Sequence, residues 1–378
     1  MSPLPENHPN PTPSISRAYQ ECRRIEQTLQ DQYHEQTSIV DLKRLINIRI
    51  LGYLIREGPT DTAKQNVAQA VLELEREGDT EGMIQLGEYY DKWFMRPFRN
   101  GDTSPDEDLD FGRRDLLSEE EEILAEGDDY ASLSLDERRN ATAKAHPRWL
   151  RQPKNYCEAK EAALIRDNWR CVLSKTLDST SLFRFGNSGS DTLSLLEAER
   201  QLRVACTTCY HIIPATTQPA TFAVFEQFGY PGLGTALSGE KIHSLKNVIT
   251  INRELREFLA QLRVCLVPIP DEPHTYHLEY PLEKTNTVPL VERLVFEKTW
   301  GVPRKIHLTR TTDFPELECE LPCPELLALH AVSCKLAYLS GLTEYLVQVE
   351  KMMLLHTNDR EEPVSGDLLA AKLMDIAE

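Results

Sequence analysis

A strongly acidic stretch in the middle of the chain limits what this sequence can fold into. Between Gly101 and Asn140, fifteen acidic residues stand against four arginines, a net charge of −11 in a chain whose formal net charge is −18. Such a run repels itself and contains little apolar surface to bury. We therefore interpret residues 101–150 as an acidic linker that divides the 378-residue chain into separate modules. An acidic tail that binds a partner or mimics DNA is the alternative.

The residues before this linker predict a small helical module. The opening MSPLPENHPNPTPS is polar and rich in proline, so residues 1–14 are expected to be a disordered tail. Apolar residues then recur at the three-to-four spacing of helices that are buried on one face, most clearly within 42–54, 67–74 and 83–93. Residues 15–100 are therefore predicted to form a helical N-terminal module.

The residues after the linker predict a mixed module followed by a long helix. Residues 154–312 alternate short helix-like and strand-like segments with glycine and proline turns. Residues 321–357 have the pattern of a long helix that is interrupted at Gly341, and 358–378 that of a short tail or helix. The chain is thus expected to be an α+β protein, with its C-terminal helices forming a hairpin packed against the mixed module.

Cysteine usage and hydropathy predict an intracellular protein, in the nucleus or the cytoplasm, with no membrane partner. No stretch approaches about eighteen consecutive apolar residues, and no apolar signal-peptide core opens the chain. Nine cysteines at irregular spacing fit free thiols in a reducing compartment better than a disulfide framework. Cys206 and Cys209 form a CxxC pair, but a structural zinc usually needs two such pairs, so we expect buried free thiols.

Several stretches of the mixed module resemble the HNH nuclease domain found in a set of fungal proteins. They are EAALIRDNWRCVLSKTLDSTSL from Glu161, HIIPATTQPATFAVFEQFGY from His211, LSGEKIHSLKNVITI from Leu237 and HTYHLE from His274. The segment LLALHAVSCKLAYLSGLTEYL from Leu326 resembles the C-terminal helix of the same proteins. The resemblance implies a ββα-metal finger, in which two short strands and a helix surround one divalent ion.

The resemblance also implies a reaction and roles for two residues. HNH-type endonucleases hydrolyse phosphodiester bonds of nucleic acids, and His211 stands at the position of their general base. A neutral imidazole suits that role because its pKa lies near the working pH. Asn247, in LKNVI, matches the asparagine that orients the loop of the base. A divalent ion (Mg²⁺, Mn²⁺ or Zn²⁺) would polarise the phosphoryl group.

The segment after Asn247 departs from the HNH pattern at the metal-ligand positions. Arg256 stands nine residues further on, where HNH proteins usually have a third histidine, and Ala260 follows one helical turn later. A guanidinium stays protonated and cannot ligate a cation, but it can bind a phosphate bidentately. Arg256 is therefore a candidate phosphate-binding residue. The metal ligands stay unknown, with Asn252 and a shell of waters as one alternative, since Mg²⁺ tolerates a largely aqueous shell.

Two functions of different class remain open from the sequence. One is a metal-dependent endonuclease that acts on nucleic acid, which the presence of His211 and Asn247 favours. The other is a catalytically degenerate HNH-fold protein that binds a phosphorylated ligand or a protein partner, which the overall acidity favours. A cysteine nucleophile at Cys209, two residues before His211, is a third alternative. Three other histidines are interpreted as surface or strand residues rather than metal ligands: His243, His274 and His277.

Overall fold

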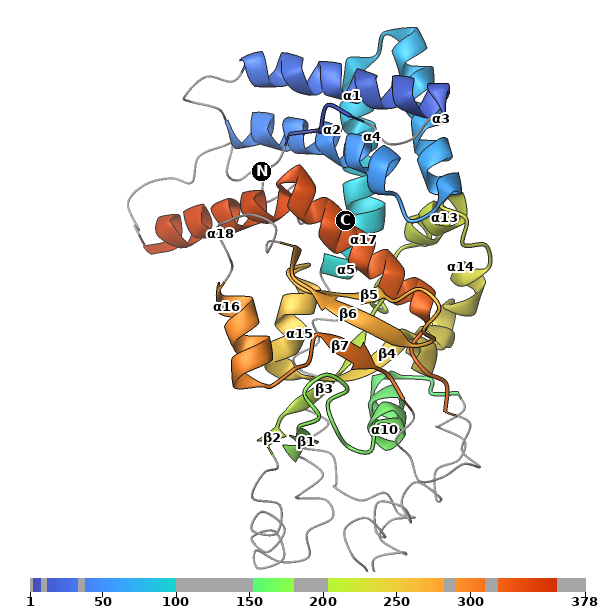
Figure 1. Cartoon of the computed structure of the whole chain (residues 1–378), viewed down its shortest axis with the longest axis vertical. Helices are drawn as coiled ribbons and strands as arrows, with labels where there is room; N and C mark the ends of the chain where they lie inside the picture. The colour runs from blue at the N-terminus through green and yellow to red at the C-terminus, as the bar shows by residue number, and fades with distance from the viewer. Residues whose placement is uncertain are drawn as a thin grey trace, which may run out of the picture. The chain divides into compact units, whose positions relative to one another are not determined.

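The computed structural model of the chain contains helices and small sheets, in keeping with an α+β protein (Figure 1). It describes residues 3–7, 12–32, 38–99, 152–179, 203–281, 290–309 and 319–358. The expected acidic linker and the tail after residue 358 lie outside these residues. The chain divides into two compact units: Met1–Pro97, Gln218–Gly234 and Leu329–Glu378 form the first, and Phe98–Thr217 and Thr235–Ala328 form the second.

The first unit is helical. It begins with α1 (Pro13–Gln32), α2 (Ile39–Glu57), α3 (Asp61–Glu77) and α4 (Thr80–Tyr90), which runs into the π-helical turn η1 (Asp91–Met95) and the short α5 (Arg96–Arg99). Figure 1 shows α1 and α2 side by side, and α2 also contacts α3 and α4. The three helical segments predicted from apolar spacing are thus confirmed, whereas α1 was not predicted.

Local capping explains where these helices begin and end. The side chains of Ser38, Thr60 and Asp79 accept hydrogen bonds from the N–H groups of the first turns of α2, α3 and α4. These N–H groups have no partner within the helix, so a short polar side chain at this position stabilises the helix start. Gly78 ends α3 in the left-handed conformation (φ 69°), which glycine adopts without a steric penalty.

Residues 3–7 lie against the helices of the first unit, which differs from the disordered tail expected for residues 1–14. The Leu4 side chain is only 3% exposed, and its N–H donates to the buried carboxylate of Glu26 (3.0 Å). The Tyr53 hydroxyl donates to the carbonyl oxygen of the preceding proline (2.9 Å). Composition alone misleads here, because polar groups of α1 and α2 satisfy the main chain of this segment.

Gly87 marks a close approach of α4 to α2, and it gives a first prediction. A Cβ built on Gly87 would lie 2.1 Å from the backbone oxygen of Asn47, which cannot move without shifting α2. We expect Gly87→Ala to lower the free energy of unfolding by about 2–3 kcal/mol, measured by urea denaturation. Gln85→Ala, an exposed change on the same helix, is the control and should stay within about 0.5 kcal/mol of wild type. A loss below about 0.5 kcal/mol in Gly87→Ala would contradict the close approach.

A segment from the middle of the chain also belongs to the first unit. Helix α13 (Pro219–Gln227) follows Gln218, and the short α14 (Leu233–Ala236) comes after it. The ring of Phe228 lies 4.9 Å from that of Phe94 in η1, in an edge-to-face arrangement. This stretch falls inside the range 154–312 that was expected to form the HNH-like module. Its aromatic residues pack with the N-terminal helices instead.

The C-terminal helices differ from the expected hairpin. Helices α17 (Pro324–Ser340) and α18 (Leu342–Asn358) are separated at Gly341 (φ 88°), so the predicted interruption is confirmed. The two helices are bent by 73° rather than reversed, and α18 contacts α2 in the first unit. The expectation of a hairpin is therefore wrong. No single described helix is long and apolar enough to span a membrane; only this bent pair passes that test of length and composition.

The described residues of the second unit form three small sheets. Strands β1 (Leu177–Asp178) and β2 (Val204–Ala205) pair in parallel, and β3 (Thr207–His211) pairs antiparallel with β4 (Val248–Asn252). Strands β5 (Cys265–Pro268), β6 (Thr275–Glu279) and β7 (Lys305–His307) form an antiparallel sheet in that order. The helical elements are α10 (Tyr156–Arg166), α15 (Arg253–Ala260), α16 (Leu290–Arg293), the 3-10 turns η3 (Gly239–His243) and η4 (Leu245–Asn247), and the π-helical η6 (Leu294–Thr299).

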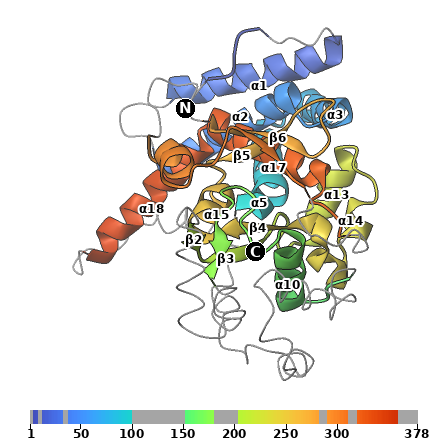
Figure 2. The same ribbon diagram turned by 60° about the horizontal axis from the view of Figure 1, so that its bottom comes forward.

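Strands β3 and β4 and the helix α15 form a ββα unit. The strands pair along their whole length, with His211 opposite Val248, and α15 begins directly after β4. Helices α10 and α15 both contact the strand pair, as Figure 2 also shows. Every residue of β3 and β4 is buried, in agreement with their β-branched and aromatic composition. The order of two strands and a helix therefore agrees with the expectation from sequence.

Candidate functional site

The pairing of β3 with β4 brings His211 and Asn247 together. His211 is the last residue of β3, and Asn247 is the residue directly before β4. The Asn247 carbonyl oxygen accepts a hydrogen bond from the N–H of Ile212, the residue after His211 (2.8 Å). Two residues that are far apart in sequence thus lie at the same end of one antiparallel pair.

The Asn247 side chain is fully buried and uses both ends of its amide. Its Oδ1 accepts from the N–H of Ile213 (2.9 Å), and its Nδ2 donates to the carbonyl oxygen of the same residue (2.8 Å). Nδ2 also donates to the carbonyl oxygen of Ile242 (2.8 Å). One amide therefore fixes the main chain after His211 and the main chain before η4. This geometry matches the orienting role that the resemblance implies for Asn247.

The His211 ring contacts two other rings. The ring of Tyr156, from α10, is stacked on it with centroids 5.8 Å apart. Nε2 of His211 lies 3.0 Å from Nδ1 of His243, at hydrogen-bond distance, with the two rings nearly perpendicular. His211 is 0% exposed, whereas His243 is partly exposed. His243 closes η3 and is partly exposed, as a surface histidine would be, but its contact with His211 was not predicted from the sequence.

A buried arginine, Arg166, binds the main chain on both sides of Asn247. Arg166, the last residue of α10, is 0% exposed and forms a two-point ion pair with Asp167 (2.8 Å for both bonds). Its Nη1 donates to the carbonyl oxygens of Leu245 (2.9 Å) and Val248 (3.1 Å), on either side of Asn247. Burial lowers the pKa of Arg166, but the charge and hydrogen bonds of Asp167 outweigh it, so the pKa is raised and the guanidinium stays charged.

Helix α15 does not offer the ligands of a divalent ion at the expected positions. Arg256 is buried and Ala260 carries no donor atom. Asn252 is the N-cap of α15, and its Oδ1 already accepts from the N–H of Glu254 (2.9 Å). Among the residues that the structure describes, no group of three or more His, Cys, Asp or Glu side chains is placed to hold a metal ion. The two expected ligand positions on α15, Arg256 and Ala260, therefore do not fit the metal that the resemblance implies.

Arg256 is nevertheless an unusual side chain for a buried position. It is 6% exposed, and its Nε has no hydrogen-bond partner. It forms a loose ion pair with Glu257, with Nη1 3.7 Å from Oε1. Among the described residues, no hydrogen bond joins Arg256 to His211 or Asn247, although its helix α15 contacts both β3 and β4.

The remaining candidates from sequence separate in space. Cys206 is exposed and precedes β3, whereas Cys209 is buried within it, so the expectation of two buried thiols holds for Cys209 only. His277 is exposed on β6, and His274 lies in the turn before that strand. Of these residues, only Cys209 shares an element with His211.

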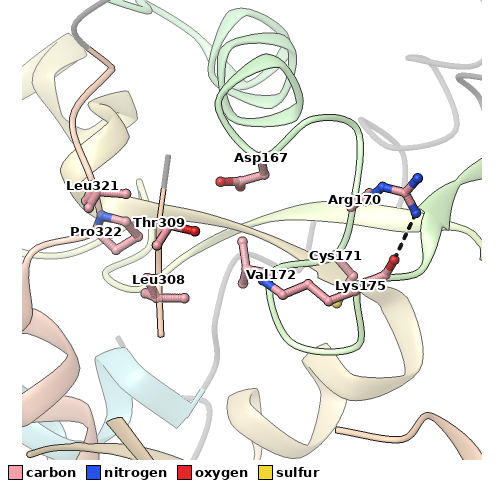
Figure 3. A pocket seen from close by; sticks show the side chains of 9 residues that line it. All are labelled: Asp167, Arg170, Cys171, Val172, Lys175, Leu308, Thr309, Leu321 and Pro322. Carbon is pink, nitrogen blue, oxygen red and sulfur yellow. Dashed lines mark hydrogen bonds between the residues drawn. The ribbon is translucent and has the colours of Figure 1, made fainter. Parts of the chain in front are cut away.

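A small cavity in the second unit lies outside this site. Figure 3 shows the Asp167 and Lys175 side chains directed toward the side lined by Leu308 and Pro322, whereas the Arg170 guanidinium points away from them. Its volume is about 30 Å³, the room of roughly one water molecule. The Arg170 guanidinium donates to the carbonyl oxygen of Lys175 (3.3 Å). Of the site residues described above, only Asp167 lines it.

Comparisons with known proteins add no family to this geometry. No protein-family model, no curated protein and no solved structure matches the chain. The HNH resemblance thus remains an expectation from sequence, to be judged by the chemistry that the residues allow.

Three residues of the site were missed or misread from sequence: Tyr156, Arg166 and His243. The signal for His243 was present, since it lies four residues before Asn247. In an antiparallel pair, the residues that precede the second strand lie beside the end of the first strand. His243 could therefore have been placed near His211. A tight ion pair between sequence neighbours, like that of Arg166, has no comparable pattern.

Proposed function

We propose that the ββα unit is the centre of an HNH-type, endonuclease-like hydrolase that acts on phosphodiester bonds of nucleic acid. The proposal rests on one observation: His211 and Asn247 lie beside each other at one end of β3 and β4, and hydrogen bonds of Asn247 fix the main chain after His211. An imidazole held in one orientation is suited to take the proton of an attacking water. A water or hydroxide oxygen then attacks phosphorus, and the bond to the departing ester oxygen breaks.

The roles follow from the contacts of each residue. His211 accepts the proton, directly or through its hydrogen-bonded neighbour. Asn247 positions His211 by holding the residues that follow it. Arg256 supplies positive charge to the phosphoryl oxygens, which a buried guanidinium does more strongly than an exposed one. None of these roles uses a divalent ion, because the expected ligand positions on α15 hold Arg256 and Ala260.

A second function is favoured by one observation, the buried Nε of Arg256 without a hydrogen-bond partner. A buried guanidinium that is not fully satisfied costs free energy, and an anionic ligand would supply the missing acceptor. In this case the chain is a catalytically degenerate HNH-fold protein that binds a phosphate-bearing ligand, or a protein partner, without cleaving it. Such a protein has no chemical use for the proton-accepting nitrogen of His211.

A cleavage assay separates the two functions. Purified protein is incubated with supercoiled plasmid or end-labelled RNA in Mg²⁺, Mn²⁺, Zn²⁺ or EDTA, beside His211→Ala and the double variant Arg256→His with Ala260→Asp. Hydrolysis by the wild type that His211→Ala lacks supports the first function, and the EDTA arm tells whether it needs a divalent ion. If the wild type does not cleave but the double variant does, the second function is supported.

Absence of cleavage by the wild type and by both variants would contradict the nuclease proposal. Binding of phosphorylated oligonucleotides then becomes the readout, with Arg256→Met as the variant. Loss of binding in Arg256→Met supports the binding function. Equal binding by wild type and Arg256→Met would contradict a phosphate-binding role for this arginine.

A further inference from the structure

His243 is partly exposed to solvent, whereas His211 is fully buried. His211 is 0% exposed, so a substrate water does not reach its ring in the structure as it stands. His243 is partly exposed and lies at hydrogen-bond distance from His211, 3.0 Å between Nδ1 and Nε2. A proton taken up by His243 can therefore reach the buried ring of His211 across a single hydrogen bond.

The same asparagine holds the chain beside both histidines. Asn247 bonds to Ile213, two residues after His211, and to Ile242, the residue directly before His243. The 3-10 turns η3 and η4 place these contacts within a single short segment. The two imidazoles are thus positioned by one side chain, an arrangement that a chance surface histidine would not need.

We propose that His243 and His211 form a proton relay in which His243 is the member that faces the substrate. This inference rests on the proposed hydrolase function. In the tautomer that the relay uses, His243 carries a proton on Nδ1, and Nε2 of His211 accepts it. The attacking water gives its proton to Nε2 of His243, and the Nδ1 proton of His243 passes to His211. The electron pair of the water oxygen forms the new bond to phosphorus, and the leaving oxygen departs with its pair and takes a proton from solvent water.

The relay makes the two histidines titrate as a pair. Only one proton fits between the facing nitrogens, so protonation of one ring changes the proton affinity of the other. Tyr156 is stacked on His211 and is the other titratable ring in contact with it. The surrounding elements carry these charged residues: Glu158, Lys160, Glu161 and Arg166 of α10, Glu240 and Lys241 of η3, Lys246 of η4, and Arg253, Glu254, Arg256 and Glu257 of α15.

The first test does not depend on cleavage. Long-range ¹H–¹⁵N spectra of the imidazoles, recorded over pH in the full-length protein, follow both rings in the wild type, in His211→Ala and in His243→Ala. We expect removal of one histidine to move the titration midpoint of the other by about 1 pH unit. His277→Ala, an exposed histidine on β6, is the matched control and should move neither midpoint. Unchanged midpoints in both site variants would overturn the relay.

The second test uses the cleavage reaction. We expect His243→Gly to lose about 10²-fold or more in cleavage rate with little change in KM, because a proton-transfer step is removed. Added imidazole should restore part of the rate to His243→Gly, whose site is open to solvent, but not to His211→Gly. A purely structural role of His243 predicts no such rescue. A rate within twofold of wild type in His243→Gly would overturn the relay.

The two tests separate the failure of this inference from that of the proposed function. A wild-type protein that cleaves nothing, but whose histidines titrate as a pair, refutes the hydrolase and the catalytic use of the relay while establishing the coupled pair. A protein that cleaves, but whose histidines titrate independently, keeps the hydrolase and refutes the relay.

Discussion

Arg166→Ala is expected to lower the free energy of unfolding by about 3–5 kcal/mol, enough to unfold the second unit in a protein of ordinary stability. The change removes a buried charge that pairs with Asp167 and leaves that carboxylate without its partner. It also removes the donor for the carbonyl oxygens of Leu245 and Val248, which would stay buried. Urea denaturation followed by circular dichroism measures the loss.

Two comparisons show whether the effect of Arg166→Ala arises from the buried ion pair. Arg170→Ala, four residues later, removes one exposed hydrogen bond and should cost less than about 0.5 kcal/mol. The double variant Arg166→Met with Asp167→Asn removes both charges. We expect its loss in the free energy of unfolding to be smaller than the sum of the losses in the single variants Arg166→Ala and Asp167→Asn. A loss below about 1 kcal/mol in Arg166→Ala would contradict the structural role assigned to this arginine.

Asn247→Ala is expected to have the second large effect, on stability and on cleavage together. The change removes three buried hydrogen bonds, two to Ile213 and one to Ile242, and leaves their main-chain groups unsatisfied. We expect a loss of about 3–4 kcal/mol in the free energy of unfolding. The chain after His211 is then no longer fixed, and a displacement near 1 Å is enough to reduce the rate by about 10²-fold.

The matched control for Asn247→Ala is Asn155→Ala at the start of α10. Asn155 is also an asparagine whose Oδ1 accepts a main-chain N–H, but it caps an exposed helix start. We expect about 1 kcal/mol of destabilisation from this change and an unaltered cleavage rate. The measurements are urea denaturation and initial cleavage rates at a temperature where both variants are folded. A folded Asn247→Ala protein that cleaves like the wild type would refute the positioning role of Asn247.

Local patterns predicted part of this fold well. The apolar spacing of residues 42–54, 67–74 and 83–93 predicted helices that the structure contains, and Gly341 predicted the break between α17 and α18. The pairing of the strands around His211 and Asn247 also agrees with expectation. These features depend on neighbours in sequence or on a short antiparallel pair, so a single sequence carries enough information for them.

Contacts between distant segments could not be read in the same way. The segment 3–7 is ordered by Glu26 and Tyr53, and its own composition gives no sign of them. Arg166 serves as a buried donor to a loop that lies some eighty residues further along the chain. A charged residue near the end of a helix is most often interpreted as solvent-exposed, because burial of a charge is favourable only where specific partners are present.

The measurement that tests the central claim most directly is the single-turnover cleavage rate of a labelled nucleic-acid substrate by the wild type and by His211→Gln. The variant keeps a polar side chain in place of the buried imidazole, and circular dichroism and the melting temperature verify its fold. We expect the wild type to cleave and His211→Gln to be slower by about 10²-fold or more, the usual contribution of a positioned general base. Equal rates for two folded proteins would contradict the assignment of His211 as the base.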